Sequence, residues 1–227
     1  KGDFVKAAES YGMAMKAYQS VPNKMLPNKN ALIANTQYAR GVALYQSGQF
    51  AESEPPLIDS VKRLHKLVRS LPPEEDGSMA LLALGVALVE LGQTLTTLER
   101  HRESEAVFLQ AIRLLEGVYE EEPSVVREYI YALSLRAKMY EATKRYRLAA
   151  EDVEHCVQVY ANLPSALAER TEALVGMIYL QSALLARHLT GRTAGNSQVV
   201  RQRIKLGMDI AKRPPNAPHI RSYIEKL

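Results

Sequence analysis

The sequence contains no tryptophan, one cysteine and no apolar run longer than the eleven residues from Met79 to Val89. That run is far shorter than the roughly 20 residues that a membrane-spanning helix needs, so no transmembrane segment is expected. Because Cys156 is the only cysteine, no disulfide can form within one chain, and a reducing compartment is favoured. The sequence therefore argues against a fold stabilised by disulfides.

The chain also lacks an initiating methionine and a charged-then-apolar leader, since it begins at Lys1. We interpret it as an excised fragment or a processed product of a larger protein. An intracellular, cytoplasmic location is expected. Targeting to an organelle stays open, because a signal could precede the first residue.

Acidic residues are scarce at the C-terminal end. The 227 residues are 47% hydrophobic and carry a net charge of +4, but residues 187–227 hold nine Lys or Arg against two acids, whereas residues 1–186 sum to −3. Such a basic end is either a solvated helix face or a site for an acidic partner. The candidate basic patch is Arg192, Arg201, Arg203, Lys205, Lys212 and Arg213.

Strand-like alternation is absent, and apolar residues recur instead at helical spacing. Glycine and proline pairs, such as Pro72-Pro73, divide the helical segments. The sequence predicts an all-α protein with helices at residues 1–20, 29–47, 50–70, 74–100, 103–119, 123–142, 146–161, 164–189 and 197–213.

The segment 34–57 shows how these helices pair. Gly41 lies inside a helix, where glycine costs roughly 1 kcal/mol relative to alanine, so a close helix crossing is expected there. Gly48 then breaks the helix, and a second amphipathic helix follows after too few residues for anything but an antiparallel hairpin. Small residues mark further hairpins at Gly85, Ala137 and Gly176, at intervals of 44, 52 and 39 residues.

The first complete hairpin resembles the tetratricopeptide repeat, whose motif runs W-x2-LG-x2-Y-x8-G-x3-A-x2-F-x-A. It departs from that family because tryptophan is absent, Lys144 replaces a turn glycine, and the intervals exceed the family's 34 residues. Longer repeats with Glu54-Pro55 after the small residue are similar to those of kinesin light chains. The residues of this hairpin that match the tetratricopeptide pattern are Gly41, Leu44, Gly48, Phe50, Ser53, Leu57 and Ser60.

The resemblance implies a right-handed superhelical array of antiparallel helical hairpins over residues 1–213, followed by a tail at 214–227. Residues 1–21 match the second helix of a truncated repeat, with Tyr11 and its neighbours in the crossing positions. The further repeats are expected at residues 29–71, 74–120, 123–162 and 164–213, the last of which includes the basic helix.

No residue pattern points to catalysis. The five histidines are not paired at metal-ligand spacing, and Glu151 with His155 is expected to form only a surface charge pair. Cys156 is expected to be a buried packing residue and not a reactive thiol. We therefore expect no enzyme activity, no cofactor and no metal site.

In tetratricopeptide-like arrays the first helices of the hairpins line a concave face that holds extended or helical peptides. Carried onto this chain, that resemblance gives a set of candidate partner-binding residues from four hairpins. They are Asn35, Tyr38, Val42, Tyr45, Gln46, Met79, Val86, Val89, Tyr131, Ser134, Lys138, Glu141, Arg170, Met177 and Gln181.

The resulting hypothesis is a non-catalytic protein–protein interaction scaffold or adaptor that binds a protein or peptide partner. One alternative is a nucleic-acid-associated protein acting through the basic C-terminal helix. Nucleic acid is disfavoured because no aromatic residues are interleaved among those charges for base stacking. A second alternative is a regulatory repeat domain of a larger enzyme.

Overall fold

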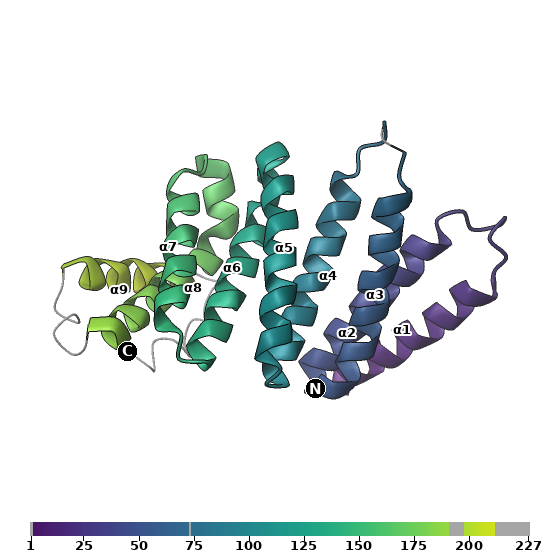
Figure 1. Cartoon of the computed structure of the whole chain (residues 1–227), viewed down its shortest axis with the longest axis horizontal. Helices are drawn as coiled ribbons and strands as arrows, with labels where there is room; N and C mark the ends of the chain where they lie inside the picture. Colours follow the sequence, from purple (N-terminus) through teal and green to yellow (C-terminus); the bar gives the residue numbers. More distant parts are fainter. Residues whose placement is uncertain (1, 73, 191–197, 212–227) are drawn as a thin grey trace. The chain divides into compact units, whose positions relative to one another are not determined.

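The computed structural model describes residues 2–72, 74–190 and 198–211, and these residues form helices without any strand (Figure 1). The prediction of an all-α protein is thus confirmed. The chain divides into two compact units, residues 1–121 and 122–227, and each is described by itself. The expected tail at 214–227 lies outside the described residues.

Unit 1, comprising residues 1–121, contains five helices, and each packs against the next one along the chain. Short connections join α2 to α3 and α4 to α5, so these pairs are antiparallel hairpins. The helices are α1 (Gly2–Ser20), α2 (Lys29–Ser47), α3 (Phe50–Ser70), α4 (Ser78–Thr97) and α5 (His101–Glu121).

Unit 2, comprising residues 122–227, begins with a 3₁₀ turn that leads into a hairpin of α6 and α7. Helix α8 packs against both α7 and α6, and α9 packs against α8. The elements are η1 (Pro123–Val125), α6 (Val126–Ala142), α7 (Tyr146–Ala161), α8 (Ser165–Thr190) and α9 (Gln198–Ala211).

The predicted bounds of α2, α3 and α7 match the structure to the residue. The largest error is at α4, which was expected from residue 74 and begins at Ser78. Asp76 explains the difference, because its carboxylate accepts hydrogen bonds from the backbone N–H and the hydroxyl of Ser78 at 2.9 and 2.6 Å. A side chain that bonds the backbone two residues later favours a turn over a helix.

The α2–α3 hairpin turns through a left-handed C-cap. Gly48 has φ of 89° and donates its N–H to the carbonyl of Tyr45 at 2.9 Å. The next N–H, that of Gln49, bonds the carbonyl of Leu44 at 2.9 Å. This pair of bonds is a Schellman motif, in which glycine avoids the steric cost of positive φ.

Two further hairpins use the same motif without glycine. Glu99 and Lys144 have φ of 61° and 59°. The residues that follow them, Arg100 and Arg145, donate their N–H groups to carbonyls five residues back at 2.9 and 2.8 Å. The expectation that Lys144 stands at a glycine-type turn position is therefore confirmed.

The shared turn also corrects the alignment of the hairpins. Counting back seven residues from each left-handed residue gives Gly41, Gly92 and Ala137, at intervals of 51 and 45 residues. Gly85, which the sequence pattern suggested as the second marker, lies one heptad earlier on α4. The error arose because α4 carries both glycines and its turn residue is Glu99, which gives no glycine signal.

The marker glycines lie at close helix crossings, as predicted. A Cβ atom on Gly41 would lie 2.5 Å from Cγ of Leu57, and one on Gly92 would lie 3.0 Å from the Phe108 ring. Gly85 is equally confined, because its Cβ would lie 2.8 Å from Leu115. These positions exclude larger side chains unless the neighbour moves.

Helix α4 forms the apolar centre of unit 1. Its Leu91 and Leu95 cluster with Leu57 of α3, and Val107 of α5 packs against the same cluster. Among the described helices, only α4 is long and apolar enough to cross a membrane, and half of its most apolar window is buried within the structure. The core helix of a globular fold has this same composition.

Helix α1 differs from α3, α5 and α7, which are the second helices of hairpins. Nine residues after the left-handed turn residue, Leu57, Phe108 and Val153 are at most 1% exposed. Tyr11, at the corresponding predicted position of α1, is 38% exposed. Only Ala8 is buried in this helix, where it packs on Ala43 and Leu44 of α2.

Candidate interaction surfaces

In unit 1 the first helices α2 and α4 contact one another. The hydroxyl of Tyr45 lies 3.0 Å from the hydroxyl of Thr97, and the Tyr45 ring lies 5.0 Å from the ring of Phe50. Tyr38 is half-buried and packs against the leucine cluster around Leu57. Both predicted tyrosines therefore pack within the unit and retain some exposed surface.

The remaining predicted residues of α2 and α4 differ in exposure. Asn35 and Gln46 are exposed, Val42 and Val86 are half-buried, and Met79 is 73% exposed. Only Val89 is fully buried, so its side chain is unavailable to a partner.

An acidic residue that the sequence analysis did not select lies on the same stretch of α4. Glu90 makes no hydrogen bond or ion pair with any described residue, and it lies one turn from Val86. Burial raises the pKa of Glu90 to about 7. Burial disfavours the charged form of a carboxyl group, and no cation offsets that effect here.

In unit 2 the first helices α6 and α8 also contact one another. The side-chain amide of Gln181 donates to the carboxylate of Glu141 at 2.6 Å, and Gln181 is 1% exposed. The structure thus brings these two predicted residues together as packing partners. Of the others, Ser134 is buried, Tyr131, Lys138 and Met177 are half-buried, and the side chain of Arg170 lies outside the described part.

A buried ion pair joins the two helices of the α6–α7 hairpin. Arg136 donates two hydrogen bonds to the carboxylate of Asp152 at 2.9 and 2.6 Å. Burial raises the pKa of Asp152, which the pairing with Arg136 opposes. The bidentate geometry is the one by which a guanidinium best stabilises a carboxylate in a protein interior.

The proposed basic patch is only partly available. Arg203 of α9 is half-buried, pairs with Glu154 of α7 at 2.6 Å and also bonds the hydroxyl of Ser182. Arg201 and Lys205 are exposed on α9. The positions Arg192, Lys212 and Arg213 lie outside the described residues.

The residues considered for catalysis or metal binding, Cys156, Glu151 and His155, make contacts within the fold. Cys156 is buried, as expected, with its thiol 3.6 Å from the carbonyl of Ile130, and burial raises its pKa. The expected Glu151–His155 pair is wrong, because Glu151 bonds Arg147 and the His155 ring contacts Tyr129 edge-on. Within the described residues, no group of three or more His, Cys, Asp or Glu is placed to hold a metal ion.

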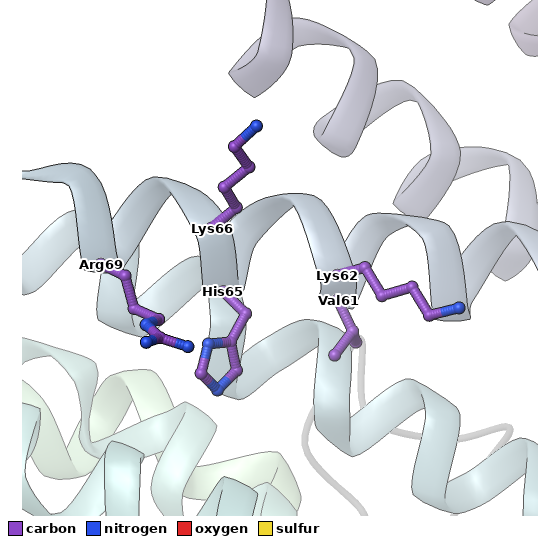
Figure 2. A pocket seen from close by; sticks show the side chains of 5 residues that line it. All are labelled: Val61, Lys62, His65, Lys66 and Arg69. Carbon is purple, nitrogen blue, oxygen red and sulfur yellow. The ribbon is translucent and has the colours of Figure 1, made fainter.

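One surface that the sequence analysis missed lies on α3. A shallow hollow is lined by Val61, Lys62, His65, Lys66 and Arg69, all of them from this one helix (Figure 2). The sequence signal was present, because residues 61–70 contain four Lys or Arg and no acid. The sequence analysis placed the basic patch at the C-terminal end because the excess of positive charge is larger there.

The sequence matches no protein-family model and no curated protein.

Proposed function

We propose that this chain is a non-catalytic protein–protein interaction scaffold, part of a larger intracellular protein or complex. In this proposal a partner segment binds to the faces of the first helices of a tetratricopeptide-like array. The observation that carries it is the contact between first helices within each unit, α2 with α4 and α6 with α8. Two helices in contact can present side chains jointly to one partner segment.

The chemistry of the α2–α4 face supports a peptide partner. Exposed amides at Asn35 and Gln46 can bond a peptide backbone, and the half-buried Tyr38 and Tyr45 lie on the same side of α2. Tyrosine offers a large contact area and loses little rotamer freedom on binding. Amides beside tyrosines form a mixed polar and apolar surface of the type found at many interfaces.

Site-specific photo-crosslinking tests the proposal. A photoreactive amino acid at Asn35 or at Gln46 should trap a discrete protein from native extract. The matched control is Gln110, which is also exposed but lies on the second helix α5. Partner bands from Gln110 and none from the two α2 positions would reject the first-helix face as the binding surface.

A substitution then separates binding from folding. Tyr45→Phe removes the hydroxyl that meets Thr97 but keeps the ring contact with Phe50. Replacing Tyr38 or Tyr45 with alanine should weaken capture of the trapped partner by about 2 kcal/mol or more if they are anchors. Thermal melts beside the binding assay distinguish an anchor from a packing residue, since intact binding with a large loss of stability identifies the latter.

A further inference from the structure

The second half of α3 carries basic side chains that the protein itself does not neutralise. Arg63 of this segment is paired with Asp59 at 2.8 Å, and Asp59 also accepts from Gln37 at 3.1 Å. In contrast, Lys66 and Arg69 are exposed and form no ion pair or hydrogen bond with the described residues. The same holds for His65 and Lys62, although Lys62 lies close enough to Asp59 to help lower the pKa of that carboxyl.

These side chains occupy one broad side of the helix, with Lys66 at its edge and directed away from His65 and Arg69 in Figure 2. Residues 62, 65, 66 and 69 are separated by three, four and seven positions, which places them on the same side within two turns. Figure 2 shows His65 and Arg69 directed toward the same region beside Val61. Seven residues of helix span about 10 Å, so the face is short.

We propose that this basic face of α3, defined as Val61, Lys62, His65, Lys66 and Arg69, docks an acidic protein segment that carries one apolar side chain. Carboxylates of the partner would neutralise cations that now repel one another. The Val61 methyl groups and the aliphatic stems of the lysines line the hollow and offer a site for the apolar side chain.

The dimensions and composition favour a protein segment over nucleic acid. An extended chain advances about 3.3 Å per residue, so alternate carboxylates about 7 Å apart fit a face about 10 Å long. Of the five residues only His65 carries an aromatic ring, so successive bases would find no series of rings to stack on. With only three Lys or Arg, contacts to phosphates would be few and would weaken steeply with salt.

This proposal is independent of the scaffold function on the first helices, because α3 is the second helix of its hairpin. The two surfaces can therefore be tested separately. If no partner is trapped at Asn35 or Gln46, the proposal for α3 is unaffected. If the acidic peptide does not bind α3, the scaffold proposal is unaffected.

The test measures binding of a labelled peptide of eight glutamates with one central leucine by fluorescence anisotropy at physiological salt. The variant Lys62→Glu/Lys66→Glu/Arg69→Glu should lose at least about tenfold in affinity. The control, Lys6→Glu/Lys16→Glu/Lys24→Glu, has the same net charge with three exposed lysines changed elsewhere, and should lose less than about threefold. Changing the peptide's leucine to serine should weaken binding several-fold.

Other outcomes overturn the proposal. Equal losses in the two triple variants would show attraction by net charge alone, and undetectable binding of the peptide would show that the face takes no such segment. A single-stranded oligonucleotide or an anionic vesicle that binds more tightly than the peptide, through the same three residues, would assign the face to that ligand. A Lys62→Gln/Lys66→Gln/Arg69→Gln variant removes the charges without adding acidic ones. If it melts at the same temperature as the unchanged protein but binds the peptide more weakly, the loss of binding comes from lost contacts and not from unfolding.

Discussion

The two compact units place polar groups between their helices in different ways. Most of the buried polar side chains of unit 1 carry hydroxyls: Ser53 lies 3.3 Å from Thr94, and Ser104 donates to the carbonyl of Gly92 at 2.8 Å. Unit 2 places a bidentate ion pair between the helices of its first hairpin, where the half-buried Arg136 bonds the buried Asp152. Neutral hydroxyls are satisfied locally at little cost, whereas each buried charge depends on its partner.

The two units differ most clearly at a pair of equivalent positions in their hairpins. Arg136 and Asp152 precede Ala137 and Val153, just as Leu91 and Val107 precede Gly92 and Phe108 in the second hairpin. An apolar pair and an ion pair thus occupy equivalent places in hairpins with the same turn. The difference shows that the turn and the small crossing residue define the hairpin, and that the neighbouring pair can vary in chemistry.

The largest expected effect comes from breaking the ion pair. Asp152→Val alone should destabilise unit 2 by up to about 3–5 kcal/mol, because it leaves the half-buried Arg136 charge without this partner. The double variant Arg136→Leu/Asp152→Val transfers the apolar pair of the second hairpin and should be neutral or stabilising. Chemical denaturation of both variants measures this, and a double variant as unstable as the single one would contradict the equivalence of the two hairpins.

A carboxyl group without a partner makes the stability of unit 1 depend on pH. Because the folded pKa of Glu90 is about 7, above its usual 4.5, the folded state holds the proton more tightly. Its contribution to stability is present below about pH 4.5, falls as pH rises and is lost above about pH 7. Glu90→Gln should therefore raise the free energy of unfolding by up to about 3 kcal/mol at pH 8 and by little at pH 4.5.

The matched control for that measurement is Glu9→Gln, since Glu9 is exposed on α1. Thermal melts at the two pH values should show no gain for this variant. A Glu90→Gln variant with the same gain at both pH values would show that the carboxyl group is not desolvated.

Replacing a glycine at a helix crossing with a larger residue should cause an intermediate loss of stability. Gly85→Leu, or the corresponding change at Gly41, should cost roughly 1–3 kcal/mol by overpacking, because the added atoms meet Leu115 or Leu57. Gly117 offers a control on α5, since nothing lies within 4 Å of its Cβ position. Unchanged melting midpoints at Gly85 and Gly41 would mean that these crossings are looser than described.

The turns offer the smallest effect, and a favourable one. Lys144 adopts the left-handed conformation that Gly48 adopts in unit 1. Lys144→Gly should stabilise the protein by about 1 kcal/mol, because glycine removes the clash between Cβ and the following carbonyl oxygen. Gly48→Ala should cost a similar amount, and melts of the two variants should shift in opposite directions.

Most helix positions were predictable because local signals determine them. Gly48 ends α2, and Pro164 precedes α8, each through backbone geometry that the residue type enforces. The register of the second hairpin was not predictable from glycine spacing. Its left-handed residue is Glu99, whose conformation comes from the hairpin and not from its own preference.

The binding residues were harder to predict, because periodicity gives the face of a helix but not what the neighbouring helix covers. Gln181 and Glu141 were selected as candidate ligands and bond one another instead. Arg203 was assigned to a basic patch, but it is engaged by Glu154 from another helix. Such pairings depend on contacts between residues 40 or more positions apart, which no local pattern contains.

The apolar character of α4 also has a consequence while the chain is being synthesised. Phe108 and Leu115 of α5 fill the space against Gly92 and Gly85, so the ribosome completes α4 before its covering residues exist. Helix α4 also leaves the ribosome before α5 does, so its apolar side chains emerge without the residues that cover them. At this stage of synthesis, chaperones or the membrane-insertion machinery can compete with folding for α4.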